Sequence, residues 1–210
     1  MENFLEKLFE SVPRARLLKL FLQNSDRFFT LPEITRKSLI KPFSAKKELA
    51  KLIKIGLVKR KTAYLQEEQR KKVGKKVKVI IRKKKAAVYY VNKDFGVWQE
   101  LRDLVTKVSV TSPHKLLRRI KGLGKVKAAI VSGVFISSPN SRTDLLIVGD
   151  NIRRSKLENF LSQIESELGK SIQYTLMDTE EFKYRMDMYD RFLRDILEYP
   201  HEKLINKLNL

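Results

Sequence analysis

The residues best suited to chemistry lie between positions 131 and 150, where Gly133, Ser141, Arg142 and Asp144 precede an apolar strand. Two carboxylates at alternate positions of a strand point to the same face, so together they can bind one Mg²⁺. Such an ion would neutralise charge on substrate phosphates during group transfer. Here Arg142 occupies the first alternate position, and only Asp144 remains. Because a cation beside a lone carboxylate repels metal ions, we expect no metal site.

The same segment, VSGVFISSPNSRTDLLIVGD, resembles the active-site strand of the nucleotidyltransferase superfamily, whose usual pattern is Gly-Ser, a short loop and Ser-Asp-x-Asp. In this chain, Gly133-Val134 stands where the family has Gly-Ser, and Ser141-Arg142-Thr143-Asp144 stands where the family has Ser-Asp-x-Asp. Similarity to minimal nucleotidyltransferase domains extends over about 113–200, through DLLIVGD, Leu-Glu-x-Phe-Leu and the closing RFLRDILEYP. The resemblance implies a small α/β domain, and the missing carboxylate implies that its activity is lost. The family's third acid has no clear counterpart, because Asp178 is expected to begin a helix.

Length and composition indicate two small domains in 210 residues, with a hydrophobic fraction of 42% that suffices for packed cores. The chain has no cysteine, which excludes disulfides and thiolate metal sites. It has no apolar run of about 18 residues, so no membrane span is expected. The beginning, MENFLEKLFE, lacks the apolar core of a signal peptide. A cytoplasmic location is the simplest expectation.

Positive charge is concentrated in the first half of the chain. Residues 1–98 have 26 Lys and Arg against 9 Asp and Glu, a net charge of +17. The net charge is +5 over 99–150 and −1 over 151–210, which accounts for the total of +21. Such a charge attracts nucleic acid regardless of its sequence. The first half is therefore the part expected to bind nucleic acid.

The order of elements predicted for that half is helix, short strand, helix, turn, helix, glycine and hairpin. Helices are expected over 11–24, from Thr30 to about Ser38, and over 43–55, with Ser11, Thr30 and Ser44 as caps. The segment TLPEITRKSLIKPFSAKKELAKLIKIGLVKRK resembles the winged helix-turn-helix family of prokaryotic transcriptional regulators. The fold class expected is α+β, divided into a winged-helix domain (1–92), a helical linker (93–112) and a nucleotidyltransferase-like domain (113–210).

In that family the helix expected at 43–55 would enter the major groove. Its buried face is expected to hold Leu49, Leu52, Ile53 and Ile55. The residues expected to contact nucleic acid are Ser44, Lys46, Lys47, Lys51 and Lys54. Because this helix has no Arg, Asn or Gln, contacts to phosphate should dominate over bidentate contacts to bases.

The wing departs from the family, since residues 66–87 form a long basic segment, QEEQRKKVGKKVKVIIRKKKAA. Gly74 is expected at the tip of a hairpin. The residues expected to contact nucleic acid here are Arg70, Lys71, Lys72, Lys75, Lys76, Lys78, Arg82, Lys83, Lys84 and Lys85. The segment is expected to act as a cationic arm; the alternative is a disordered, solvated loop.

In the second half, helices are expected over 113–121, 153–168, 179–188 and 190–198, and strands near 126–134, 143–149 and 171–177. Ser155 and Thr179 are the expected caps of the second and third of these helices. Tyr184, Met186, Met188 and Tyr189 are interpreted as core or interface residues.

Together these features predict a transcriptional regulator that binds double-stranded DNA and whose second domain is an inactive nucleotidyltransferase fold used for partner, dimer or ligand contacts. No cofactor is expected. Two alternatives stay open: an active nucleotidyltransferase that modifies RNA or protein, and a basic protein associated with RNA or the ribosome. Whether the protein forms a homodimer is also open, since many regulators of this type dimerise to match the two half-sites of a DNA operator.

Overall fold

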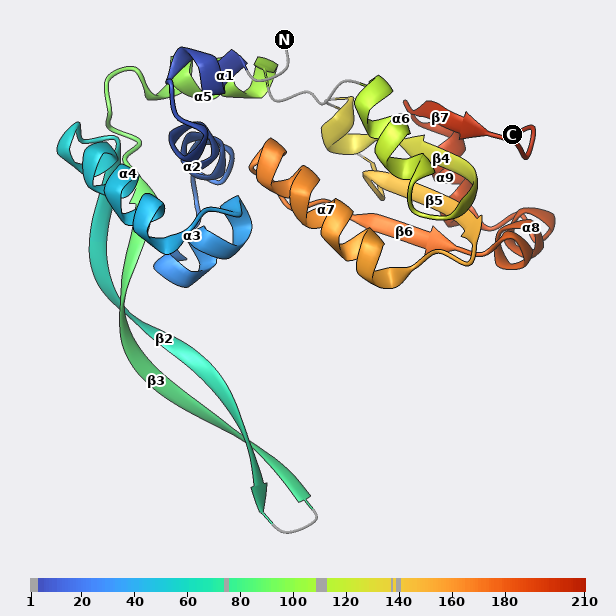
Figure 1. Ribbon diagram of the computed structural model, residues 1–210. Helices are drawn as coiled ribbons and strands as arrows, with labels where there is room; N and C mark the ends of the chain where they lie inside the picture. Colours follow the sequence, from blue (N-terminus) through green and yellow to red (C-terminus); the bar gives the residue numbers. More distant parts are fainter. Residues whose placement is uncertain (1–3, 74–75, 109–112, 137, 139–140) are drawn as a thin grey trace.

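The computed structural model describes residues 4–73, 76–108, 113–136, 138 and 141–210 (Figure 1). Over 67–73 and 76–82 the description covers the backbone alone. The chain is a mixed α+β protein with two separate sheets. No helix in these ranges combines the length and the apolar character needed to cross a membrane.

The N-terminal part packs helices around the root of a long hairpin. A three-stranded antiparallel sheet has the order β1-β3-β2. One hydrophobic cluster joins the helices to this sheet and includes Phe21, Phe29 and Trp98. The elements are α1 (Phe4–Leu8), α2 (Val12–Gln23), β1 (Phe29–Thr30), α3 (Leu31–Ser38), α4 (Pro42–Lys54), β2 (Val58–Val73), β3 (Lys76–Val91) and α5 (Trp98–Val108).

Two helices of this part begin where local capping patterns predict. The Ser11 hydroxyl accepts a hydrogen bond from the Arg14 backbone N–H and caps α2. Thr30 and Glu33 form a capping box at α3, in which each side chain accepts from the other residue's backbone N–H. Both predictions are confirmed. The sequence could predict these caps because each one joins residues only three positions apart.

Helix α4 differs from its prediction in its first turn and in its apolar face. It begins at Pro42, and the residue at its N-cap is Lys41, which makes no side-chain capping bond, so the prediction of Ser44 as the cap is wrong. Proline at the first turn needs no N–H partner and favours this start. Ile53 and Ile55, which were expected on the buried face, are exposed, and Ile55 is the C-cap residue that follows the helix.

Strands β2 and β3 form a hairpin far longer than a typical wing. Their register pairs Val58 with Val91 at the root and Val73 with Lys76 near the tip. Sixteen residues per strand correspond to about 50 Å of extended chain. The hairpin projects beyond every other element in Figure 1. The prediction of a paired arm is confirmed for the backbone; the expected tip, Gly74, lies outside the described residues.

The C-terminal part is a four-stranded sheet covered on both faces. Its order is β6-β5-β4-β7, with β5 and β6 parallel and the other neighbours antiparallel. Helices α6 and α7 pack against one face, and α8 and α9 pack against the other (Figure 1). The elements are α6 (Pro113–Lys121), β4 (Lys125–Val131), the short 3-10 helix η1 (Gly133–Phe135), β5 (Leu145–Asp150), α7 (Arg154–Leu168), β6 (Tyr174–Met177), α8 (Thr179–Asp187), α9 (Arg191–Glu198) and β7 (Glu202–Asn206).

Several details of the C-terminal part differ from expectation. Arg153 and Asp178, not Ser155 and Thr179, are the N-cap residues of α7 and α8. Strand β7, absent from the prediction, completes an edge of the sheet beside β4. Of the four residues interpreted as core or interface, Met186 packs against the cluster beneath α8 and α9, whereas Tyr184, Met188 and Tyr189 are exposed and so do not belong to the core.

The two parts touch where α7 ends against α2 and α3. The Asn24 side-chain amide donates to the Gly169 carbonyl at 2.6 Å, and Lys37 donates to the Ser171 hydroxyl at 3.2 Å. Gly169 has φ +78°, and a Cβ there would lie 2.5 Å from the Lys19 carbonyl. Glycine is therefore needed both for the left-handed helix end and for the close approach of α2.

Candidate nucleic-acid interface

The outer face of α4 combines cations with exposed apolar side chains. Spacings of three, four and seven residues place Phe43, Lys46, Lys47, Ala50 and Lys54 on one exposed face. The opposite face is buried against the core and holds Ala45, Glu48, Leu49 and Leu52. The only acidic residue of the helix is therefore turned away from the cations.

Three of the lysines predicted on α4 are available to a ligand. Lys46, Lys47 and Lys54 have no ion-pair or hydrogen-bond partner within the part of the chain that the structure describes. Lys51 differs, because its ammonium group lies 2.7 Å from a Glu48 carboxylate oxygen. Ser44, the fifth predicted residue, is half-buried on the flank of the face.

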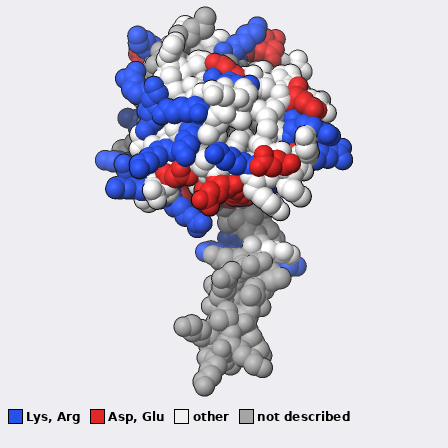
Figure 2. All heavy atoms as spheres, turned by 90° about the vertical axis from the view of Figure 1, so that its right-hand side faces the viewer, with Lys and Arg blue, Asp and Glu red and all other residues white. Residues whose placement is uncertain are grey.

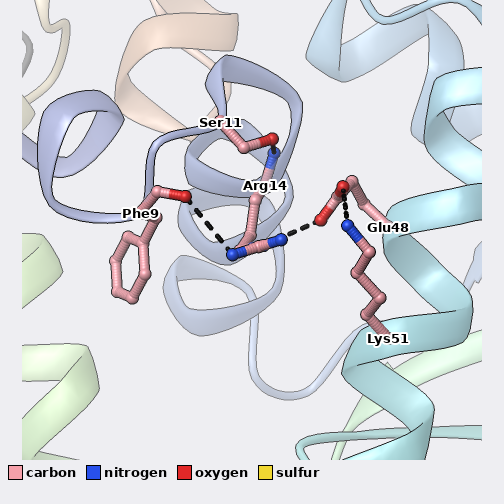
Figure 3. Close-up of polar contacts among 5 residues, drawn as sticks. All are labelled: Phe9, Ser11, Arg14, Glu48 and Lys51. Atoms are coloured by element: carbon pink, nitrogen blue, oxygen red, sulfur yellow. Dashed lines mark hydrogen bonds and ion pairs between the residues drawn. The ribbon is translucent and has the colours of Figure 1, made fainter.

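A small ionic network fixes α4 to α2. The Arg14 guanidinium donates to Glu48 at 2.8 Å and to the Phe9 carbonyl at 3.3 Å (Figure 3). Lys51 donates to the other Glu48 oxygen, so both carboxylate oxygens have a charged partner. Glu48 is 6% exposed, which protects these contacts from water. The network sets the rotation of α4 and so the direction of its outer face.

The pKa of Glu48 reflects two opposing effects. Burial raises it by disfavouring the charged form, and the hydrogen bonds from Lys51 and Arg14 lower it; the net result is a pKa below the ordinary value. A carboxyl whose pKa falls on folding stabilises the fold above its unfolded pKa. That stabilisation is lost as the pH decreases through the folded-state pKa.

Glu48→Gln is therefore expected to lower the free energy of unfolding by about 1–2 kcal/mol at neutral pH, because it leaves Arg14 and Lys51 without their counter-charge. The difference from the natural protein should shrink below about pH 4, because Glu48 takes up a proton first in the unfolded state, where its pKa is higher. Urea unfolding at several pH values measures both effects. Glu10→Gln, on an exposed residue, is the matched control; an equal loss in both variants would contradict the role of the network.

The basic hairpin contributes the second group of predicted contacts. Lys83, Lys84 and Lys85 are exposed on β3. Lys75 lies outside the described residues, as do the side chains of Arg70, Lys71, Lys72, Lys76, Lys78 and Arg82. For the described backbone, the register pairs Lys71 with Lys78 and Lys72 with Val77, so these positions follow one another along two paired strands.

An aromatic cluster at the root of the hairpin was not predicted from the sequence. Phe28 and Tyr90 meet edge to face with ring centroids 5.2 Å apart, and the Lys61 ammonium lies 3.7 Å above the Phe28 ring. An open hollow of about 420 Å³ adjoins them, bordered by the ion pairs Asp26–Lys93 and Lys59–Asp94. Phe28 and Tyr90 are 62 residues apart, so only the pairing of β1 with β3 brings them together.

The described residues of the motif, Gly133, Val134, Ser141 and Asp144, are joined by hydrogen bonds. One oxygen of Asp144 accepts from the Val134 N–H at 2.9 Å, and the other accepts from the Gln173 N–H at 2.8 Å. Ser141 accepts from the Gly133 N–H at 2.9 Å. Gly133 has φ +54°, and a Cβ there would lie 2.0 Å from the Asp144 carboxylate. Asp144 thus ties β5 to the turn after β4 and to the segment before β6.

Arg142, which takes the place of an acid, forms an ion pair with Asp195 of α9. The described residues contain no group of three or more His, Cys, Asp or Glu side chains arranged to bind a metal ion. Asp150, at the end of β5, is paired instead with Lys127 at 2.9 Å and accepts from the Thr179 hydroxyl at 2.8 Å. These bonds lower the pKa of Asp150 to about 2.

The C-terminal part does not present a surface of one sign. Figure 2 views the molecule from this side, and both cationic and anionic side chains are spread over the face. Residues 113–210 have 17 Lys and Arg against 13 Asp and Glu, a net charge of +4, compared with +17 over residues 1–98. The excess of positive charge in the sequence therefore lies chiefly in the N-terminal half, which includes α4 and the hairpin.

Comparison with known proteins gives no relative: no family model matches the chain, no curated protein matches it, and no solved structure matches it.

Proposed function

We propose that this protein binds double-stranded DNA through α4 and the β2–β3 hairpin, as a winged helix-turn-helix regulator. The order α2, β1, α3, α4, hairpin is the order expected for that fold. The segment between β1 and the hairpin carries the sequence resemblance. The observation that supports the proposal most is the outer face of α4, where Lys46, Lys47 and Lys54 have no side-chain partner among the described residues. Helix α4 itself contacts β2 at the root of the basic hairpin (Figure 1).

The two elements would bind in complementary ways. Helix α4 is short and convex, which suits the major groove. The hairpin is long and narrow, and its cations would follow the phosphate backbone or a groove beyond α4. Because α7 contacts α2 and α3, the C-terminal part would sit behind this surface and move with it.

The C-terminal part is proposed to be a nucleotidyltransferase-like domain without activity, used for partner or dimer contacts. Support comes from the two backbone bonds that occupy both oxygens of Asp144, and from the ion pair of Arg142. A carboxylate engaged in this way is a poor ligand for Mg²⁺, which needs free oxygen donors. The C-terminal part carries both signs of charge and much less net positive charge than the N-terminal half, which suits contacts with protein better than wrapping by nucleic acid.

The proposal is tested by titrating the protein against random duplex DNA, genomic duplex fragments and structured RNA over a series of salt concentrations. A genomic fragment bound about 10³-fold more tightly than random duplex would establish a specific regulator. Uniform binding with steep salt dependence would instead indicate a non-specific nucleic-acid protein. Tighter binding to RNA at equal salt would contradict the assignment to DNA.

A further inference from the structure

Phe43 stands out on the outer face of α4 because its side chain is 80% exposed. It lies in the first turn of the helix, at the end that a recognition helix directs to the bases. Its aromatic ring is held outward by a helix that Glu48 and the core fix in place. No packing role within the described chain accounts for so large an apolar side chain at this position.

The neighbours of Phe43 indicate which kind of partner it meets. Ala50, two turns further along the helix, adds a second and smaller apolar side chain on the same face. Lys46, Lys47 and Lys54 surround the two apolar side chains, and the face has no acid. A partner must therefore present apolar groups close to negative charge. In the major groove of DNA, the thymine C5-methyl groups lie between two rows of phosphates.

The composition of α4 leaves few other ways to distinguish bases. The helix has no Asn or Gln to read adenine and no Arg to read guanine, so lysine is the one long side chain left that can read a base, guanine, by hydrogen bonds. Its lysines can contact phosphates without regard to sequence. Apolar contact with the thymine methyl group is then the means by which this face can recognise an A·T pair.

We propose that Phe43 contacts thymine methyl groups in the major groove and so gives the protein a preference for 5-methylated pyrimidines. The inference rests on the proposed function, because it requires α4 to enter DNA. Ala50 extends the same apolar track toward the next turn of the helix. Burying one methyl group against the ring should strengthen binding about fourfold for each methyl contacted.

The test compares duplexes that differ only in the methyl group. One pair is a 24-base-pair alternating A·T duplex made with thymine or with uracil; the other is an alternating G·C duplex made with cytosine or with 5-methylcytosine. The natural protein is expected to bind the methylated member of each pair several-fold more tightly. For each pair, the methyl ratio is the affinity for the methylated duplex divided by the affinity for its unmethylated partner. Phe43→Ala should bring both methyl ratios close to one. Phe43→Leu, which retains an apolar side chain, should preserve part of the preference.

Tyr184→Ala is the matched control, since it removes another exposed aromatic ring, on α8. Its methyl ratios should equal those of the natural protein. Both substitutions are on the surface, so melting temperatures should not change. Equal ratios for Phe43→Ala and the natural protein would overturn the methyl contact while leaving DNA binding intact. A uniform loss of affinity on all four duplexes would also overturn it, and would favour stacking on bases. Failure of the natural protein to bind any duplex would reject the proposed function itself.

Discussion

Replacing the ten basic residues between Arg70 and Lys85 with threonine is expected to weaken binding to duplex DNA by at least about 100-fold at moderate salt. Each lysine or arginine that meets a phosphate releases condensed counterions, and this release supplies most of the sequence-independent affinity. A hairpin of about 50 Å can follow more than one turn of duplex, whose pitch is roughly 34 Å. In the proposed complex with DNA, the β2–β3 hairpin would therefore make most of the phosphate contacts.

The salt dependence should change together with the affinity. The slope of log K against log salt is about −0.9 for each phosphate neutralised, so losing six contacts should flatten it by about five units. Threonine is chosen because it favours strands and keeps the hairpin pairing while removing charge. Fluorescence anisotropy over roughly 50–200 mM salt measures both quantities.

The matched control removes charge elsewhere. Lys156, Lys170, Lys183 and Lys207 lie in the C-terminal part, and their ammonium groups have no partner among the residues that the structure describes. Replacing them with glutamine lowers the net charge but should leave the salt slope nearly unchanged. An unchanged affinity in the hairpin variant, or an equal loss in both variants, would remove the arm from the binding surface.

The sequence predicts those features that depend on neighbouring residues. Ser11, the Thr30–Glu33 capping box and the glycine after α4 mark helix ends through bonds within one turn. The alternating strands and the long basic segment likewise follow from local pattern. Asp178 was expected to begin a helix, and it caps α8 by accepting from the Glu181 N–H.

Features that depend on distant segments were not predicted. Lys51 looks like a free surface cation in the sequence, but a buried Glu48 shared with Arg14 binds it, and Arg14 is 34 residues away from that glutamate. Strand β7 has few strand-forming residues and exists because β4 offers it an edge to pair with. Asp144 bonds to Gln173, 29 residues further along. Sequence spacing cannot reveal such partners, because they meet only when distant segments of the chain pack together in the fold.

The turn closed by Asp144 leads to a second large effect. Asp144→Ala is expected to lower the free energy of unfolding of the C-terminal part by about 2–4 kcal/mol, because it leaves the N–H groups of Val134 and Gln173 without their charged acceptor. Asp144→Asn keeps one acceptor oxygen and should lose less. The only tryptophan, Trp98, lies in the N-terminal core. In urea, far-ultraviolet circular dichroism should therefore show an early transition that Trp98 fluorescence does not follow.

A double-mutant cycle with Gly133 isolates the role of the carboxylate. Gly133→Ala alone should destabilise by a similar amount, since the added Cβ would lie 2.0 Å from the Asp144 oxygen at a left-handed φ. In the Asp144→Ala background the clash disappears, so Gly133→Ala should cost about 1–2 kcal/mol less there than in the natural protein. Additive losses would contradict the contact. If Asp144→Ala instead left stability unchanged and abolished a Mg²⁺-dependent nucleotide transfer, Asp144 would be a catalytic ligand and the domain an active enzyme. Asp144→Ala therefore separates the two roles: a structural Asp144 predicts a loss of stability, and a catalytic Asp144 predicts a loss of activity.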